Sequence, residues 1–261
     1  MGDIITLTTD FGTKDWFVGT IKGVILRIQP GATVLDITHE IPAGNLRAAA
    51  FALAASCRFF PRGTIHVAVV DPGVGSRRGA ILVQTSDYFF LGPDNGILSW
   101  ALKREKIQSV RRLENEKYFL LPVSQTFHGR DVFAPVAAHL SEGVPLKNFG
   151  PEQKEFIRLP WPEPKRLAGK LQGEIIYIDR FGNAITNLNS EWLADLDAAK
   201  VYILAAGHRL SGVKGFYQEA PAGRAVALVS SSGFLEIAVN GGSAAAKLRL
   251  RIGDKVFACA S

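Results

Sequence analysis

Residues 4–37 read IITLTTDFGTKDWFVGTIKGVILRIQPGATVLDI, and this stretch decides the fold. It opens with a short β-branched run from Ile4 to Leu7, which predicts a strand. Apolar residues then recur at helical spacing from Trp16 to Ile28, and a second β-branched run follows from Thr33 to Ile37. A strand, a helix and a strand in this order predict two parallel strands joined by a crossover helix.

The same alternation continues through the first half of the chain. Ile65 to Val70 predicts another buried strand, and the segments Leu46 to Cys57 and Val132 to Leu140 predict helices, the latter amphipathic. This rhythm is typical of the α/β class, so we expect a Rossmann-like domain with a largely parallel sheet.

A break in the pattern separates this region from the rest. Between Pro145 and Gly169 the chain is rich in proline and charge. We therefore expect an N-terminal α/β domain over residues 1–160 and a smaller C-terminal domain over residues 161–261. Short strand-like runs in the second domain favour an antiparallel β-barrel, with a sandwich as the alternative; they are Gly173 to Ile178, Val201 to Ala205, Ala225 to Val229 and Phe234 to Val239.

Composition restricts the class of protein. The formal charge of +6 comes from basic residues scattered among acids, so we expect no nucleic-acid partner. No apolar run is long enough for a membrane span and no signal-peptide pattern opens the chain, which predicts a cytoplasmic protein without a membrane partner. Cys57 and Cys259 offer neither a disulfide framework nor metal-ligand spacing, and we expect no metal site.

Three acidic turns belong to the first domain. Asp10 follows the first strand, Asp71 opens the turn DPGVG after the strand Ile65 to Val70, and Asp94 lies in the turn GPDNG. Ligands of open α/β sheets bind outside the carboxyl ends of the strands, so these carboxylates are candidates for a binding site. Taken singly, each is better explained by capping a helix or bonding local amides.

Two further positions place a polar side chain beside a regular element. His128 lies in TFHGRD, directly before a predicted helix, where free backbone donors favour a neutral imidazole. Asn183 ends DRFGN, and its amide both donates and accepts, as the edge of a purine requires. A capping histidine and an ordinary β-turn are the alternatives at these two positions.

Six short motifs occur in order along the chain: TDFG (9–12), VDPGVG (70–75), PDNG (93–96), FHGRD (127–131), DRFGN (179–183) and SSGFL (231–235). Together they resemble the S-adenosyl-methionine hydroxide adenosyltransferases, a resemblance that spans nearly the whole chain. The implied activity is hydrolysis of S-adenosyl-L-methionine to adenosine and L-methionine, with no cofactor beside the substrate. The same superfamily includes enzymes that fluorinate or chlorinate the same carbon.

The resemblance also implies roles for particular residues. Asp71, Arg78 and His128 would activate a water molecule for in-line attack on ribose C5′. Asp10 would hold the ribose hydroxyls, and Asn183 would bind the adenine edge. The rest of the methionine and adenosine pocket would include Asp71, Asp179, Glu236, the backbone near Val239, and Ser231, with Ser230 or Ser232 as the alternative to Ser231.

Departures from the halogenating branch favour hydrolysis. That branch has tyrosine where this chain has Asp71 and serine where it has Gly129, and it carries a long insertion where this chain runs directly from Ala80 to Phe90. A carboxylate repels an incoming halide but orients water. A non-catalytic adenosine-binding or S-adenosyl-methionine-binding regulatory protein is the second alternative. The resemblance further implies a homotrimer whose active sites join the first domain of one subunit to the second domain of its neighbour.

Overall fold

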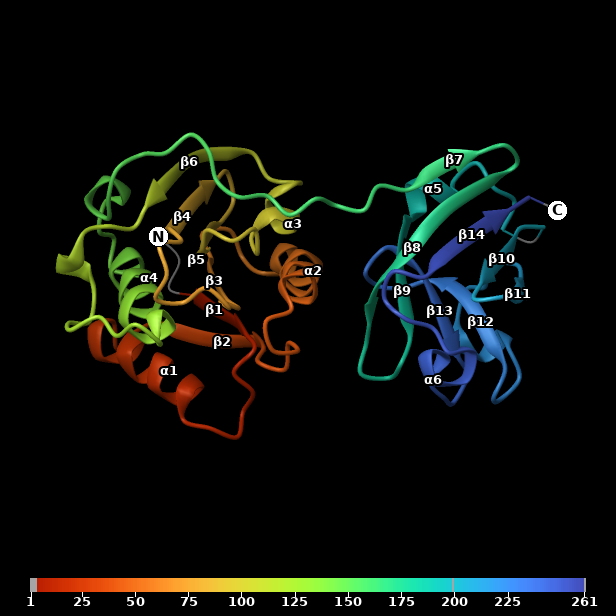
Figure 1. Ribbon diagram of the computed structural model, residues 1–261, viewed down its shortest axis with the longest axis horizontal. Helices are drawn as coiled ribbons and strands as arrows, with labels where there is room; N and C mark the ends of the chain where they lie inside the picture. The colour runs from red at the N-terminus through yellow and green to blue at the C-terminus, as the bar shows by residue number, and fades with distance from the viewer. Residues whose placement is uncertain (1–3, 199, 261) are drawn as a thin grey trace. The chain divides into compact units, whose positions relative to one another are not determined.

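The computed structural model describes residues 4–198 and 200–260 and contains two compact units. The first unit ends at Pro160 and the second begins at Trp161, within the proline-rich segment. Each unit has its own sheet (Figure 1). Each also has its own hydrophobic core.

The first unit is built on one six-stranded sheet. Its strands are β1 (Ile4–Thr9), β2 (Thr33–Thr38), β3 (Ile65–Val69), β4 (Ala80–Thr85), β5 (Phe89–Pro93) and β6 (Ile107–Arg112). Their order is β2-β1-β3-β5-β4-β6, in which β2, β1, β3 and β5 pair in parallel and β4 pairs antiparallel with β5 and β6. The connection from β4 to β5 is too short for a crossover helix, so these strands form a hairpin.

The sheet is therefore mixed. The α/β class predicted from the sequence is confirmed, whereas the antiparallel edge departs from the largely parallel sheet that was expected. The Rossmann-like assignment stays a prediction.

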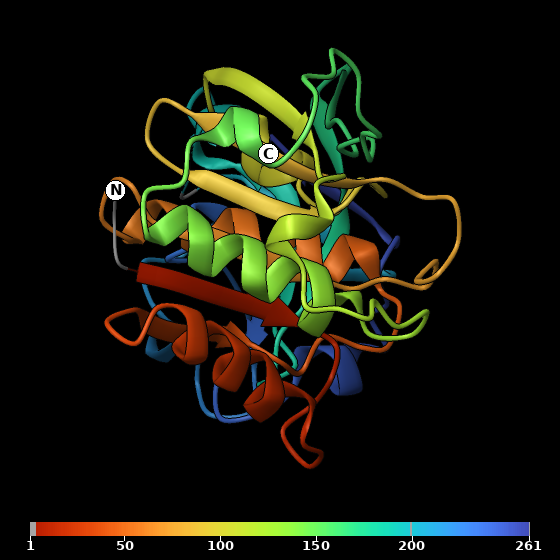
Figure 2. The ribbon, with the colours of Figure 1, turned by 90° about the vertical axis from the view of Figure 1, so that its left-hand side faces the viewer.

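The described α-helices of this unit are α1 (Phe17–Ile28), α2 (Leu46–Ser56), α3 (Ser99–Leu102) and α4 (Ala134–Ser141). α1 packs against α4, and Figure 2 shows these two helices side by side. α2 packs against α3 and against β1 and β2. Asn45 caps α2, because its side chain accepts a hydrogen bond from the backbone N–H of Ala48 at 3.0 Å.

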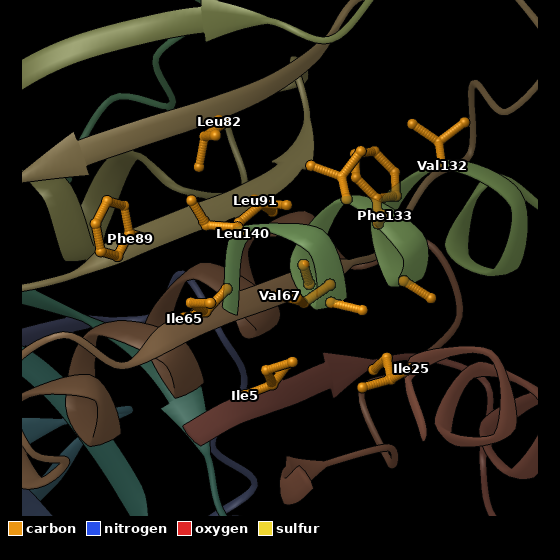
Figure 3. Packing of buried hydrophobic residues seen from close by; sticks show 14 of the residues in the cluster. Ile5, Ile25, Ile65, Val67, Leu82, Phe89, Leu91, Val132, Phe133 and Leu140 are labelled. Atoms are coloured by element: carbon orange, nitrogen blue, oxygen red, sulfur yellow. The ribbon is translucent and has the colours of Figure 1, made fainter. Parts of the chain in front are cut away.

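The main core of this unit lies between one face of the sheet and the helices α1 and α4. Alternate residues of a strand point to the same face, and Leu82 and Leu91 from neighbouring strands pack with Phe133 and Leu140 (Figure 3). Each such side chain contributes about 1.5–3 kcal/mol when it is fully buried. This packing fixes the segment around α4 against the strands whose ends carry the acidic turns.

The helix predicted over Val132 to Leu140 differs from the structure in two respects. A π-helical turn covers Gly129–Phe133, and the α-helix begins only at Ala134. The prediction that this helix is amphipathic is also wrong, because every residue of α4 except His139 is buried. The physical reason is that α4 contacts α1 as well as β1 and β3, so apolar neighbours surround it.

The described residues of the second unit form one antiparallel sheet and two short α-helices. The elements are β7 (Lys165–Leu167), β8 (Lys170–Ile178), β9 (Ala184–Asn189), α5 (Ser190–Leu193), β10 (Tyr202–Ala205), β11 (His208–Ser211), β12 (Ala225–Val229), β13 (Phe234–Val239), α6 (Ala244–Leu248) and β14 (Lys255–Cys259).

The order of this sheet is β11-β10-β14-β8-β9-β13-β12, with β7 added to β8. The end strands β11 and β12 contact each other, so the sheet nearly closes into the barrel-like form that the sequence predicts. In the described parts of both units, no helix is long and apolar enough to cross a membrane.

Candidate active site

The turn that follows β3 carries the first charged group of the candidate site. Asp71 opens this turn, and its backbone oxygen accepts from the N–H of Val74 at 3.1 Å. Gly75 has a φ of +77°, and a Cβ at this position would lie 2.3 Å from the backbone oxygen of Gln125. Glycine therefore allows the turn to approach the segment before α4 more closely than any other residue would.

Arg78 folds back on Asp71 and forms an ion pair with it. Its Nε donates to both carboxylate oxygens, at 3.0 Å to Oδ1 and 2.9 Å to Oδ2, and its Nη2 also donates to Oδ2. The Arg78 and Asp71 side chains are only 10% and 6% exposed. Because little solvent screens the pair and its bonds are charge-assisted, its geometry is held more firmly than that of a surface ion pair.

The same Nη2 also reaches His128, at 2.7 Å from Nδ1. A guanidinium has donors only, so Nδ1 is the acceptor and the imidazole is neutral. Burial lowers the pKa of His128, and the charge of Arg78 lowers it further, against the opposing effects of Asp71 and Asp131. The ring is neutral, as the sequence predicts, but the main cause is burial and not a helix terminus.

His128 directly precedes the π-helical turn Gly129–Phe133. Within this turn Asp131 is fully buried, and its carboxylate accepts from the backbone N–H of Ser124 at 2.9 Å. It also pairs with Arg130, whose Nε lies 2.6 Å from Oδ1. These bonds tie the loop that precedes His128 to the turn that follows it. Such π-helical turns occur frequently at functional sites.

A cavity of about 240 Å³ lies beside these groups in the first unit. Asp10, Asp71 and His128 line it together with the rings of Phe11 and Phe127. The two rings meet edge to face, with their centroids 5.8 Å apart. The structure thus brings three predicted site residues to one small, partly apolar space.

The other acidic turns differ from each other. Oδ2 of Asp10 accepts from the backbone N–H of Gly44 at 2.8 Å, which positions this carboxylate at the cavity. Oδ1 of Asp94 instead accepts from the backbone N–H of Ile157 at 2.8 Å, and Asp94 is absent from the described lining of that cavity. Among residues 4–198 and 200–260, no group of three or more His, Cys, Asp and Glu side chains is placed to hold a metal ion.

The second unit places another part of the predicted set beside its own cavity, of about 780 Å³. Asn183 and Val239 line this cavity. The carboxylate of Asp179 accepts from the backbone N–H of Asn183 at 2.8 Å and from its Nδ2 at 3.1 Å. Asp179 therefore fixes the orientation of the Asn183 amide, and Asn183 as a whole is only 7% exposed.

Glu236 and Ser231 have different relations to this cavity. Glu236 is 3% exposed and accepts from the hydroxyl of Tyr217, a cavity-lining residue, at 2.9 Å. Burial raises the pKa of Glu236, and burial together with Glu236 raises the pKa of Tyr217 to about 12. Ser231 is exposed and does not belong to the described cavity lining, while its neighbours Ser230 and Ser232 bond to each other at 2.8 Å.

Sequence reasoning missed the aromatic side chains of both cavities. Phe11 and Phe127 line the smaller cavity, and Phe181, Phe216 and Tyr217 line the larger one. Phe181 and Phe216 are 76% and 57% exposed, which is unusual for such large apolar groups. The signal in the sequence is an aromatic residue beside a glycine in a loop, where a ring is available to stack on a planar ligand.

The sequence matches known proteins over nearly its whole length. Residues 5–150 match the S-adenosyl-methionine hydroxide adenosyltransferase N-terminal domain, and residues 173–257 match the C-terminal domain of the same family. A Salinispora arenicola protein named (R)-S-adenosyl-L-methionine hydrolase is 38% identical, over 97% of this chain and 96% of its own length. A protein of the same name from Thermus thermophilus is 39% identical, over 95% and 96%.

More distant and structural relatives agree with this assignment. A fluorinase from an Actinoplanes species is 27% identical, over 96% of this chain and 95% of its own length. The crystal structure of an uncharacterized conserved protein from Thermotoga maritima matches with a TM-score of 0.93 and 37% identity, covering 98% of this chain and 99% of that one. With both domains matched, the family resemblance inferred from six motifs is confirmed, and the chain belongs to the S-adenosyl-methionine hydroxide adenosyltransferase family.

Proposed function

We propose that this protein hydrolyses S-adenosyl-L-methionine to adenosine and L-methionine. The observation that carries the proposal is the hydrogen-bonded series Asp71, Arg78 and His128 at a cavity that also contains Asp10. Relatives named (R)-S-adenosyl-L-methionine hydrolase, which match nearly the whole chain, support it. The proposal includes no cofactor beside the substrate.

The reaction is an in-line displacement at ribose C5′. The oxygen of a water molecule forms a bond to C5′ while the bond from C5′ to sulfur breaks, and the electron pair of that bond stays on sulfur. Methionine leaves as a neutral thioether and needs no proton. The attacking water loses one proton, and since the pKa of unbound water is about 15.7, a positioned proton acceptor is required.

Asp71 is this acceptor in the proposed mechanism. Its carboxylate lines the cavity, where it orients the water and takes its proton late in the displacement. A positioned acid–base group contributes about 10²–10⁴-fold in rate, and holding the nucleophile in line contributes further. Arg78 stabilises the developing hydroxide charge, and His128, whose Nδ1 accepts from Arg78 at 2.7 Å, holds Arg78 in place.

The remaining predicted residues are proposed to hold the substrate. The larger cavity, with its exposed aromatic rings, is suited to a purine base, and Asn183 lines it. Ser231 has the least support, because it is exposed and lies outside the described lining. The proposed contacts are Asp10 to the ribose hydroxyls, Asn183 to the adenine edge, and Asp179, Ser231, Glu236 and the backbone near Val239 to the methionine and adenosine parts.

We also propose a homotrimer. The reacting residues and the proposed ribose contact Asp10 lie in the first unit, and the proposed adenine contact Asn183 lies in the second, so a complete site requires one unit of each kind. In the proposed assembly these two units come from neighbouring subunits. Light scattering on the purified protein measures its mass, and a fully active monomer would contradict the trimer. The cytoplasmic location and the absence of a nucleic-acid partner stay predictions.

Halogenation at C5′ is the competing activity. The carboxylate of Asp71 opposes an incoming halide. At Gly129 a Cβ would lie 3.2 Å from Cδ1 of Ile21 and 3.4 Å from the ring of Phe11, so a hydroxyl side chain there requires these neighbours to shift. Incubation with chloride or fluoride, followed by chromatography for 5′-halo-adenosine, distinguishes the two activities.

One experiment tests hydrolysis directly. The purified protein is incubated with S-adenosyl-L-methionine in oxygen-18 water, and the products are analysed by mass spectrometry. We expect the label in the 5′-hydroxyl of adenosine and none in methionine. Bound adenosine without any turnover would instead identify a non-catalytic binding protein.

A further inference from the structure

A second cavity in the first unit also adjoins Arg78 and His128. Its volume is about 510 Å³, twice that of the cavity that holds Asp10 and Asp71. Among the described residues, His128 is the one that lines both cavities. The mechanism proposed above uses only the smaller cavity and assigns no role to the larger one.

The outer part of this second cavity is polar and open to solvent. Nε of Arg112 pairs with Oε1 of Glu114 at 2.9 Å, and both side chains are about half exposed, at 50% and 49%. Glu116 and Gln125, which also line the cavity, are exposed. A space with polar partners holds water, and at about 30 Å³ per molecule this one has room for roughly ten or more.

Hydrolysis creates a need for such a space. Each turnover releases one proton at a moment when adenosine and methionine still fill the substrate cavity. A proton retained on Asp71 removes the charge that pairs with Arg78, a guanidinium whose side chain is only 10% exposed. An unpaired and mostly buried charge is costly, so a route for the proton that avoids the products favours completion of the cycle.

We propose that the 510 Å³ cavity, called the exit chamber below, carries this proton from His128 to solvent. The inference rests on the proposed hydrolysis. Neutral Asp71 binds Arg78 less strongly, and when the guanidinium turns away from both partners, Nδ1 of His128 takes the proton from the Asp71 carboxyl. The imidazolium then gives its Nε2 proton to chamber water, which leaves the ring neutral, and proton exchange with water returns the remaining proton from Nδ1 to Nε2, so that Nδ1 again accepts from Arg78. Burial lowers the pKa of His128, so the charged ring releases its proton readily.

Two residues at the mouth of the exit chamber allow a test. Leu121 and Gln125 line the chamber and are exposed, Leu121 by 59%, and neither belongs to the reacting set. Leu121→Trp and Gln125→Trp narrow the mouth, and Leu121→Ala and Gln125→Ala are the matched controls that leave it open. Thermal unfolding verifies that all four variants remain folded.

The measurement compares two events in a single turnover, proton release followed with a pH-indicator dye and adenosine formation followed by chemical quench. In the wild type and the alanine variants, we expect the proton to appear as adenosine forms. In the tryptophan variants, we expect the rate of proton release to be about tenfold lower than the rate of adenosine formation, because the proton leaves only when the products do. Simultaneous release in the tryptophan variants, or late release in the wild type, would overturn the exit chamber alone. A wild type that forms no adenosine would overturn both proposals.

Discussion

Replacing Asp71 by asparagine should nearly abolish turnover while substrate affinity stays close to that of the wild type. The amide has almost the shape of the carboxylate but carries no charge and is a poor proton acceptor. Loss of a positioned acid–base group costs about 10²–10⁴-fold in rate, which corresponds to about 3–5 kcal/mol in the activation free energy. We therefore expect kcat to fall by that factor.

The same substitution should also lower the free energy of unfolding, through Arg78. The guanidinium donates three hydrogen bonds to a carboxylate that is 6% exposed. Hydrogen bonds to charged groups contribute about 1.5–3 kcal/mol, and an unpaired buried charge costs about 3–5 kcal/mol. The asparagine oxygen and His128 remain as acceptors for the guanidinium, so its charge is not left fully unpaired. We therefore expect the free energy of unfolding to fall by about 2–3 kcal/mol, less than the cost of an unpaired buried charge.

Three measurements separate these effects: adenosine release by chromatography for kcat, calorimetry for substrate affinity, and urea denaturation for stability. Asp195→Asn is the matched control, because its ion pair with Arg166 lies at the surface with side chains 73% and 54% exposed. This control should change none of the three quantities. If Asp71→Asn retains turnover within about tenfold of the wild type, a difference of only 1.4 kcal/mol, Asp71 is not the proton acceptor.

Three further predictions concern other parts of the site. Burial lowers the pKa of His128, so kcat should fall on the acidic side only below the ordinary histidine pKa of about 6.5. Below that pH Nδ1 becomes protonated and stops accepting from the guanidinium of Arg78. A fall of kcat that already begins above this pH contradicts the neutral ring. Asn183→Ala should weaken adenosine binding by about 1–3 kcal/mol in calorimetry, and unchanged affinity would remove the adenine assignment. Gly75→Ala should lower the free energy of unfolding by more than Gly143→Ala does, by about 1–3 kcal/mol. Both glycines have a positive φ, but an added Cβ would lie 2.3 Å from the backbone oxygen of Gln125 at Gly75 and would meet nothing within 4 Å at Gly143. Equal losses in urea denaturation contradict the close approach at Gly75.

The sequence predicted the elements whose pattern is local. β12 and β13 have the predicted bounds, and the strand ends at Asp10 and Asp71 follow from short β-branched runs. The hairpin of β4 and β5 was not predicted, since an apolar run does not show the direction in which a strand pairs. The π-helical turn at Gly129 was missed for a similar reason, because no local residue pattern marks it and its contacts are with α1 and α4.

The candidate site was predicted through family resemblance more than through spacing. Nothing in the sequence near Arg78 shows that its Nη2 reaches both Asp71, seven positions before it, and His128, fifty positions after it. This convergence requires the close approach of two loops at Gly75, which only the folded chain shows. The exposed rings of Phe181 and Phe216 were not singled out, because aromatic residues in a sequence are assigned to a core by default.

The division of these residues between two units has a consequence for how variants should behave. The ion pair of Asp71 and Arg78 and the neutral ring of His128 belong to the first unit, and its packed core holds them in place. Asn183 and the aromatic rings belong to the second unit, around a separate and larger cavity. Substitutions in the first set should therefore change kcat with little effect on affinity, whereas substitutions in the second set should change affinity first. Because binding energy from the nucleoside also positions C5′ before the water, the largest losses in the second set should extend to kcat as well.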